Sequence, residues 1–240
     1  DLGGFNTEAA SANLLYDGPA IRAIYKFDWT DSTFSAPALA GFTTEYPDLV
    51  INDYSAIPLR AYRNVTVTGN GYGMVEDLGP ASRSLVIMGT LRVQRGGYFS
   101  SNNRLVTGPG NFVLEPGATL IIHSLQGISQ SGATGSVQVT GNRSFGRHAN
   151  YEYDVPPTAP AITGSGLPDT VRAVSFYGTP NYPFTLSNHL TVRNELLLLG
   201  GSLHLGSSNL TLLSDSHGTA SLFNDDFNAV VNTCTGRVTV

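Results

Sequence analysis

The stretch Leu85-Val-Ile-Met-Gly-Thr-Leu-Arg-Val93 decides the fold, because apolar side chains recur in it at alternate positions on either side of a short break. A second stretch, Leu190-Thr-Val-Arg-Asn-Glu-Leu-Leu-Leu198, repeats the pattern at a constant offset (190 − 85 = 105). Alternate side chains of an extended strand point to opposite faces, so each stretch predicts one buried and one exposed face. Two such copies indicate related strand modules that stack and share one interior.

The same offset extends past the two stretches. It matches Tyr98 with Leu203 and Leu105 with Leu210, and therefore predicts that Tyr98 and Leu105 face the interior. A related strand precedes each copy, Val65-Thr-Val67 before the first and Val174-Ser-Phe176 before the second.

Short apolar runs closed by Gly, Asn, Ser or Pro fill the chain from about Arg60 onward, which is typical of strands separated by turns. Further examples are Phe112-Val-Leu114, Leu120-Ile-Ile122, Val137-Gln-Val139, Leu203-His-Leu205 and Leu210-Thr-Leu212. Their spacing favours a β-solenoid of the parallel β-helix type. A β-sandwich is the alternative, because its strands are equally short. Two-residue Asn-Gly or Asp-Gly hairpin turns are scarce, which favours the solenoid.

Composition agrees with an all-β chain and excludes some partners. The sequence has 27 Gly and 13 Pro, and only 13% charged residues. Its 13 Lys and Arg face 18 Asp and Glu, so we expect no nucleic acid partner. No run reaches the roughly 18 apolar residues of a membrane helix, so membrane insertion is not expected. The single cysteine, Cys234, allows no internal disulfide and is expected to be a buried small residue.

Domain organisation follows from a change in pattern near residue 60. Residues 1–60 carry aromatic clusters, including Tyr25, Phe27 and Trp29, and are predicted to form a cap or leading module. Residues 61–240 are predicted to form the solenoid, with related modules at about 61–165 and 166–240. The aromatics at alternate positions are expected to cap the first coil rather than bind a ligand.

The strand-and-turn style resembles that of very large secreted cell-surface proteins of Bacteroidota. The residues that carry the resemblance are Gly110–Ile122, Gly127–Phe145, Asn150–Tyr153, Gly166–Val171, Leu186–Val192, Gly201–Leu212 and Gly236–Val240. The resemblance implies an extracellular protein exported by the type IX secretion machinery, of the kind that includes gliding-motility adhesins. It brings no catalytic residues to this chain, and residues 1–60 lie outside it.

Candidate chemical groups are few. Glu152 and Asp154 are two residues apart and are predicted to share one face of a strand, whereas the acids in Glu76-Asp77 and Asp225-Asp226 are adjacent and would face apart. Acids beside Gly, Asn or Pro mostly serve turns, which is the expectation for all three pairs. Asp225 and Asp226, with Asn224 or Asn228, could hold Ca²⁺, although the spacing lacks the Asp-x-Asp-x-Asp-Gly loop.

The remaining groups give no clear site. The five His, at 123, 148, 189, 204 and 217, lack metal-ligand spacing, so no catalytic residue, metal site or cofactor is predicted. Tyr98, Tyr177 and Tyr182 could form an exposed strip that binds a sugar or a protein, although Tyr98 is expected to be buried. Ser32 and Thr170 follow aspartate in a pattern of O-linked glycan acceptors on exported Bacteroidota proteins, so they are possible O-glycosylation sites.

The sequence therefore predicts a non-enzymatic structural or adhesive segment of a secreted bacterial surface protein, with surface polysaccharide or protein as its ligand. Two alternatives stay open. One is a carbohydrate-active β-helix enzyme, a lyase or hydrolase, which would need Glu152, Asp154 and a nearby Arg to converge in an open groove. The other is a subunit of a larger surface or secretion assembly, bound through residues 1–60.

Overall fold

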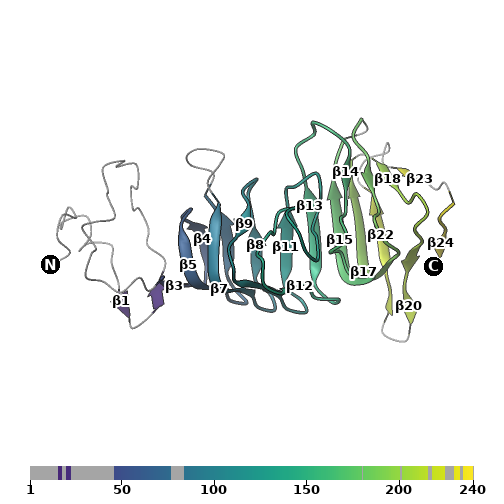
Figure 1. The fold of residues 1–240 in the computed structure, drawn as a ribbon. Helices are drawn as coiled ribbons and strands as arrows, with labels where there is room; N and C mark the ends of the chain where they lie inside the picture. The colour runs from purple at the N-terminus through teal and green to yellow at the C-terminus, as the bar shows by residue number, and fades with distance from the viewer. Residues whose placement is uncertain are drawn as a thin grey trace.

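The computed structural model describes residues 46–76, 84–179, 181–200, 202–215, 218–224, 230–232 and 235–239, and the strand positions 16–17 and 20–22. None of these residues lies in a helix. The chain winds into a β-solenoid of about seven turns, whose strands lie side by side across a long axis (Figure 1). The prediction of an all-β solenoid is confirmed. The sandwich alternative is wrong, since most neighbouring strands pair in parallel.

Sheet A forms one face of the first part of the solenoid. Its main strands are parallel from β2 onward, with β1 antiparallel to β2 and β9 also paired to β7. The strands are β1 (Tyr16–Asp17), β2 (Ala20–Arg22), β3 (Asp48–Ile51), β5 (Ala61–Val67), β7 (Leu85–Val93), β9 (Val106–Thr107), β10 (Asn111–Leu114) and β12 (Arg143–Ser144).

Sheet B runs along the whole described solenoid, and all its pairs are parallel. Its strands in spatial order are β4 (Tyr54–Ile57), β6 (Tyr72–Val75), β8 (Tyr98–Ser100), β11 (Thr119–Ile122), β13 (Asn150–Asp154), β15 (Thr170–Tyr177), β17 (Leu190–Leu199), β19 (Leu210–Leu212) and β24 (Val238–Thr239). In addition, β22 (Ser221–Asn224) pairs with β17.

Sheet C replaces sheet A as the partner of sheet B in the second part. It contains β14 (Ala161–Ile162), β16 (Phe184–Thr185), β18 (Ser202–His204) and β23 (Val230–Asn232). A small antiparallel hairpin, β20 (Ser214–Asp215) and β21 (Gly218–Thr219), precedes β22. From β3 to β13 the strands alternate between sheets A and B, except that the consecutive β9 and β10 both lie in sheet A. From β13 to β19 they alternate between sheets B and C.

The internal repeat is present in three dimensions, although its copies lie in different sheets. The pair β5 and β7 in sheet A has the same irregularity as the pair β15 and β17 in sheet B. Between two paired positions the first strand advances by two residues (Tyr62 to Asn64, Val171 to Ala173), whereas the second advances by three (Ile87 to Thr90, Val192 to Glu195). Leu85 and Leu190 are both buried at the start of their strands, as predicted.

The offset slips by one residue after the long strands, and two predictions are therefore wrong. Tyr98 is 41% exposed and Leu105 is 42% exposed, whereas their neighbours Phe99 and Val106 are fully buried. Phe99 thus occupies the place of Leu203 (203 − 99 = 104) and Val106 that of Leu210 (210 − 106 = 104). The slip begins at the turns, since Gly96 and Gly200 both have a left-handed φ, +83° and +86°.

The interior is one continuous apolar cluster from Leu49 to Ala220. All the other inward positions predicted from the alternating pattern are buried, for example Ile87, Leu114 and Leu198. Two tyrosines join them and satisfy their hydroxyls internally: Tyr151 donates to the Gly146 carbonyl and Tyr153 to the Thr163 carbonyl, each at 2.8 Å. This burial raises the pKa of both Tyr151 and Tyr153 well above the ordinary value. Strands β3 and β4, at 48–57, already pair with the solenoid, and the predicted module boundaries stay predictions.

Candidate functional site

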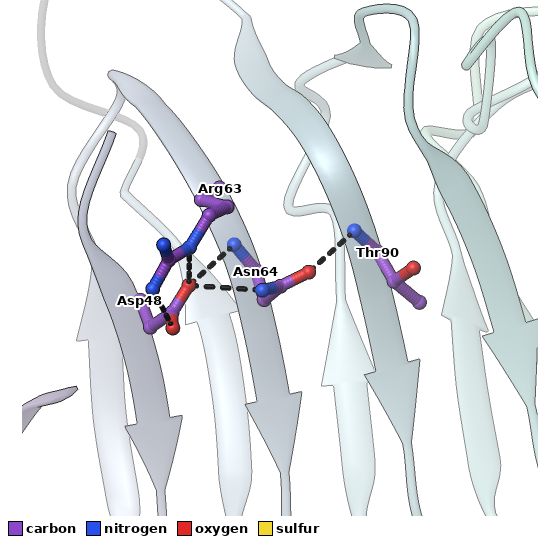
Figure 2. Close-up of polar contacts among 4 residues, drawn as sticks. All are labelled: Asp48, Arg63, Asn64 and Thr90. Carbon is purple, nitrogen blue, oxygen red and sulfur yellow. Dashed lines mark hydrogen bonds and ion pairs between the residues drawn. The ribbon is translucent and has the colours of Figure 1, made fainter. Parts of the chain in front are cut away.

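A polar chain crosses the outward side of sheet A at a shallow hollow of about 290 Å³ (Figure 2). Asp48 on β3 accepts bonds from the backbone N–H of Asn64 (3.1 Å) and from its side-chain amide (3.0 Å). The amide oxygen of Asn64 in turn accepts from the backbone N–H of Thr90 on β7, at 2.9 Å. Arg63 adds an ion pair to Asp48 at 2.6 Å, and this bond with the guanidinium lowers the pKa of Asp48.

This polar chain serves the backbone. The register of β5 and β7 shifts between Asn64 and Tyr62, so the Thr90 N–H lies where the regular strand ladder is interrupted. The Asn64 side chain supplies an acceptor there, and Asp48 holds Asn64 in place. Buried or half-buried backbone groups need such partners. The arrangement accounts for the polar groups that line the hollow.

Replacing Asn64 with alanine is therefore expected to destabilise the chain by about 1–3 kcal/mol, because it leaves the Thr90 N–H without its acceptor. Urea unfolding followed by circular dichroism measures the change. Thr66→Ala, at the same outward face and not in the chain of bonds, is the matched control and should change stability much less. Equal effects of the two substitutions would contradict the assigned role of Asn64.

The outward side of sheet B carries the other polar groups. On β13, Glu152 lies between the fully buried Tyr151 and Tyr153, and Asp154 follows Tyr153, so the prediction that the two acids share one face is confirmed. The expectation that they serve a turn is wrong, because both lie within a strand. Glu152 has no hydrogen bond or ion pair with any described residue. Desolvation, and then the charge of Asp154, raise the pKa of Glu152.

Ser100, at the end of β8, and His123, which directly follows β11, form a line of contacts that ends at Asp154. The Ser100 hydroxyl lies 2.9 Å from His123 Nε2, and His123 Nδ1 lies 4.0 Å from an Asp154 carboxylate oxygen. The Asn102 N–H donates to Ser100 Oγ at 3.2 Å, which leaves the serine proton for His123. Ser100 is only 1% exposed and the histidine–aspartate distance exceeds a hydrogen bond. The contacts therefore satisfy buried polar groups, which is the ordinary need of such atoms.

The two arginines on the neighbouring turn and strand, Arg147 and Arg172, are bonded to residues other than Glu152 and Asp154. Arg172, on β15, bonds the Asn150 side chain at 3.1 Å, and Arg147 pairs with Asp169 at 2.7 Å. Glu76 follows β6, and partial burial raises its pKa. Thr170, the possible glycan acceptor, begins β15 and its hydroxyl lies 3.4 Å from Arg147.

Some predicted residues lie outside the described part of the chain: Ser32, Asp77, His217, Asp225, Asp226, Asn228, Cys234 and the aromatics Tyr25, Phe27 and Trp29. Among the described residues, no group of three or more His, Cys, Asp and Glu gathers as metal ligands would. The same residues include no helix long and apolar enough to cross a membrane.

Sequence reasoning missed a ladder of three tyrosines on sheet B. Tyr54, Tyr72 and Tyr98 occupy paired positions on β4, β6 and β8. Their ring centroids are 5.1 Å and 6.0 Å apart, and both pairs are stacked. The signal was weak, because the three residues are unequally spaced along the chain. Only the strand register places them in one column.

The ionisation of Glu152 has a predictable effect on stability. Its folded-state pKa is raised, so ionisation costs stability as pH rises from the ordinary glutamate value through the raised one. Glu152→Gln is therefore expected to unfold at a higher urea concentration than the parent at pH 7, and at the same concentration well below about pH 4. Urea midpoints measured across this range test it, and a variant less stable at pH 7 would contradict it.

Sheet B thus has two features that could contact a ligand, the tyrosine ladder and the carboxylates of Glu152 and Asp154, whereas the polar chain on sheet A supports the backbone. Known proteins add no further guide to the site. A scan against family models, a search of curated proteins and a search of solved structures each found no match to this chain.

Proposed function

We propose that the chain is a structural and adhesive segment of a secreted bacterial surface protein. It would act as a rod that displays a broad outward surface at a distance from the cell. The observation that supports it best is the uninterrupted parallel sheet B, from β4 to β24, over a single filled interior. Each strand pairs with the next through backbone hydrogen bonds. Such a stack carries load along its axis without depending on any one contact.

The filled interior supports a mechanical role over a storage or transport role. Large aromatic side chains occupy the centre, among them Phe99, Phe112 and Phe176, each at most 1% exposed. Stacked contacts continue along the axis, as between Tyr153 and Phe176 at 5.2 Å. A close-packed interior of this kind resists local deformation.

Origin and export belong to the same proposal. Export by the type IX machinery of a Bacteroidota cell, gliding-motility adhesion and O-glycosylation at Thr170 or Ser32 rest on the sequence resemblance. Mass spectrometry of native material tests the glycan sites, with unmodified Ser32 and Thr170 as the contrary result.

Pulling on the two ends of the folded chain tests the mechanical role. We expect a small number of force peaks as groups of solenoid turns, or rungs, unfold together, because each rung contacts only its neighbours. A single-molecule force measurement on the parent and on Phe112→Ala provides the comparison. The role is contradicted if the parent extends smoothly, without resolvable peaks.

A carbohydrate-active enzyme remains the second candidate, and one observation favours it: Glu152 is half-buried, unpaired and beside Asp154. Perturbed carboxylates of this kind occur at catalytic sites. Incubation with acidic and neutral polysaccharides tests it, with Glu152→Gln as the matched variant. Product formation that Glu152→Gln abolishes would replace the adhesive proposal.

A further inference from the structure

The tyrosine ladder on sheet B is exposed although its rings are in contact. Tyr54 is 58% exposed and Tyr98 is 41% exposed. The two stacked contacts, at 5.1 Å and 6.0 Å, align the three rings along the solenoid axis. Exposed aromatic carbon loses unfavourable contact with water when a flat apolar surface covers it. The ladder is therefore a place where a ligand with flat apolar faces gains stability.

The strand register places the tyrosine ladder close to the two carboxylates. In the paired register Tyr98 is followed by Thr119 on β11 and then by Asn150 on β13, two residues before Glu152. Tyr177 pairs with Asp154 on the next strand and is 39% exposed. Burial raises the pKa of Tyr72 most, and the neighbouring Tyr54 and the charges of Glu152 and Asp154 raise it further. The rings and the acids thus lie on the same face of sheet B, on either side of β11.

The two carboxylates of this surface form no ion pair with a described Arg or Lys. Glu152 has no cationic partner among the described residues, and the Asp154 side chain, which is 59% exposed, meets only His123 at 4.0 Å. A ligand that brings a positive charge would pair with these carboxylates. An ammonium group is also attracted to the faces of tyrosine rings.

We propose that this surface, made of Tyr54, Tyr72, Tyr98, Glu152 and Asp154, binds a glycan that carries free amino groups. The sugar rings pack against the exposed parts of the two end rings, Tyr54 and Tyr98, each of which stacks on Tyr72, and the ammonium groups pair with the carboxylates. A glycan fits better than a peptide, because peptides dock mainly at sheet edges or in grooves, and these residues lie on the face of a continuous sheet. The inference rests on the proposed adhesive function and names its ligand.

Titration calorimetry with a glucosamine hexamer and an N-acetylglucosamine hexamer tests the inference at about pH 7, because the pKa of Glu152 is raised above its ordinary value. We expect the parent to bind the glucosamine hexamer at least about tenfold more tightly than the acetylated one. Tyr98→Ala should weaken both, while Tyr98→Phe keeps the ring and should retain most of the affinity. The double variant E152Q/D154N should bind both hexamers alike.

Two variants with the same chemistry elsewhere are the controls. Tyr46→Ala removes a tyrosine that is 40% exposed outside the ladder, and Glu115→Gln removes a carboxylate that is paired with Arg92 on sheet A. Both should bind as the parent does, and urea unfolding confirms that each variant is folded.

Three results would overturn the inference: no binding of the glucosamine hexamer, equal binding by the parent and a folded Tyr98→Ala, or tighter binding of oligolysine than of the hexamer. The last would identify a peptide as the ligand. These outcomes are separate from the mechanical test, because the force measurement needs no ligand. A rod that fails to bind would keep its structural role.

Discussion

Replacing Arg143 with methionine is expected to destabilise the chain by about 3–5 kcal/mol, because the carbonyls of the buried residues Ser129 and Val139 lose their donor inside the protein, and that of the exposed Gly132 loses one nearer the surface. The Arg143 guanidinium donates to the carbonyls of Val139 at 2.9 Å, Ser129 at 3.0 Å and Gly132 at 2.6 Å. The residue is only 7% exposed, and desolvation lowers its pKa. Methionine fills similar space but offers no donor.

Urea unfolding measures this effect, and Arg147→Met is the matched control. Arg147 forms an ion pair with Asp169 in which both side chains are well exposed, 64% and 66%. Exposed pairs of this kind contribute less than about 1 kcal/mol. Equal midpoints for the two arginine variants would show that Arg143 does not hold the segment from Ser129 to Val139.

Phe112→Ala should cost a similar amount, about 3–5 kcal/mol, through loss of buried surface and the cavity left behind. Phe112 is fully buried on β10, with its ring 6.4 Å from that of Phe99 and 5.4 Å from that of Phe145. The cavity would open the interior between three successive rungs. Hydrogen exchange should then increase first in β7, β10 and β12, because rungs open locally.

The neighbouring residue provides the control for this substitution. Val113 lies on the outward side of β10 and is only half-buried, so Val113→Ala should change stability by well under 1.5 kcal/mol. Uniform hydrogen exchange along the whole solenoid in Phe112→Ala would contradict the view that each rung depends mainly on its neighbours.

The inward face of the solenoid was predictable because it depends on local alternation. Positions such as Leu91, Val139 and Leu205 are fully buried, as the pattern of every second residue requires. The same alternation, continued from Val137 and Val139, also places Arg143 inside. Residue type gives the opposite expectation, because charged side chains usually remain in water, and the sequence alone therefore did not indicate a buried arginine.

The outward face was less predictable because it depends on register between distant strands. The prediction that Glu152 and Asp154 share one face of a strand depends only on local alternation, and it is confirmed. The column of Tyr54, Tyr72 and Tyr98 depends on turn lengths that vary from rung to rung. The error at Tyr98 has the same origin: a turn shorter by one residue exchanges the inward and outward sides of the following strand.

Paired cysteines test the in-register stack most directly, in a background where Cys234 is replaced by serine. Thr66 and Arg92 are neighbours on β5 and β7, and Ser175 and Leu197 are neighbours on β15 and β17. Adjacent parallel strands lie within the distance a disulfide spans. We predict that oxidation joins a cysteine pair at each of these two places and leaves a pair at Thr66 and Thr90, which are out of register, unjoined. Efficient bridging of Thr66 with Thr90, and none of Thr66 with Arg92, would contradict the solenoid described here.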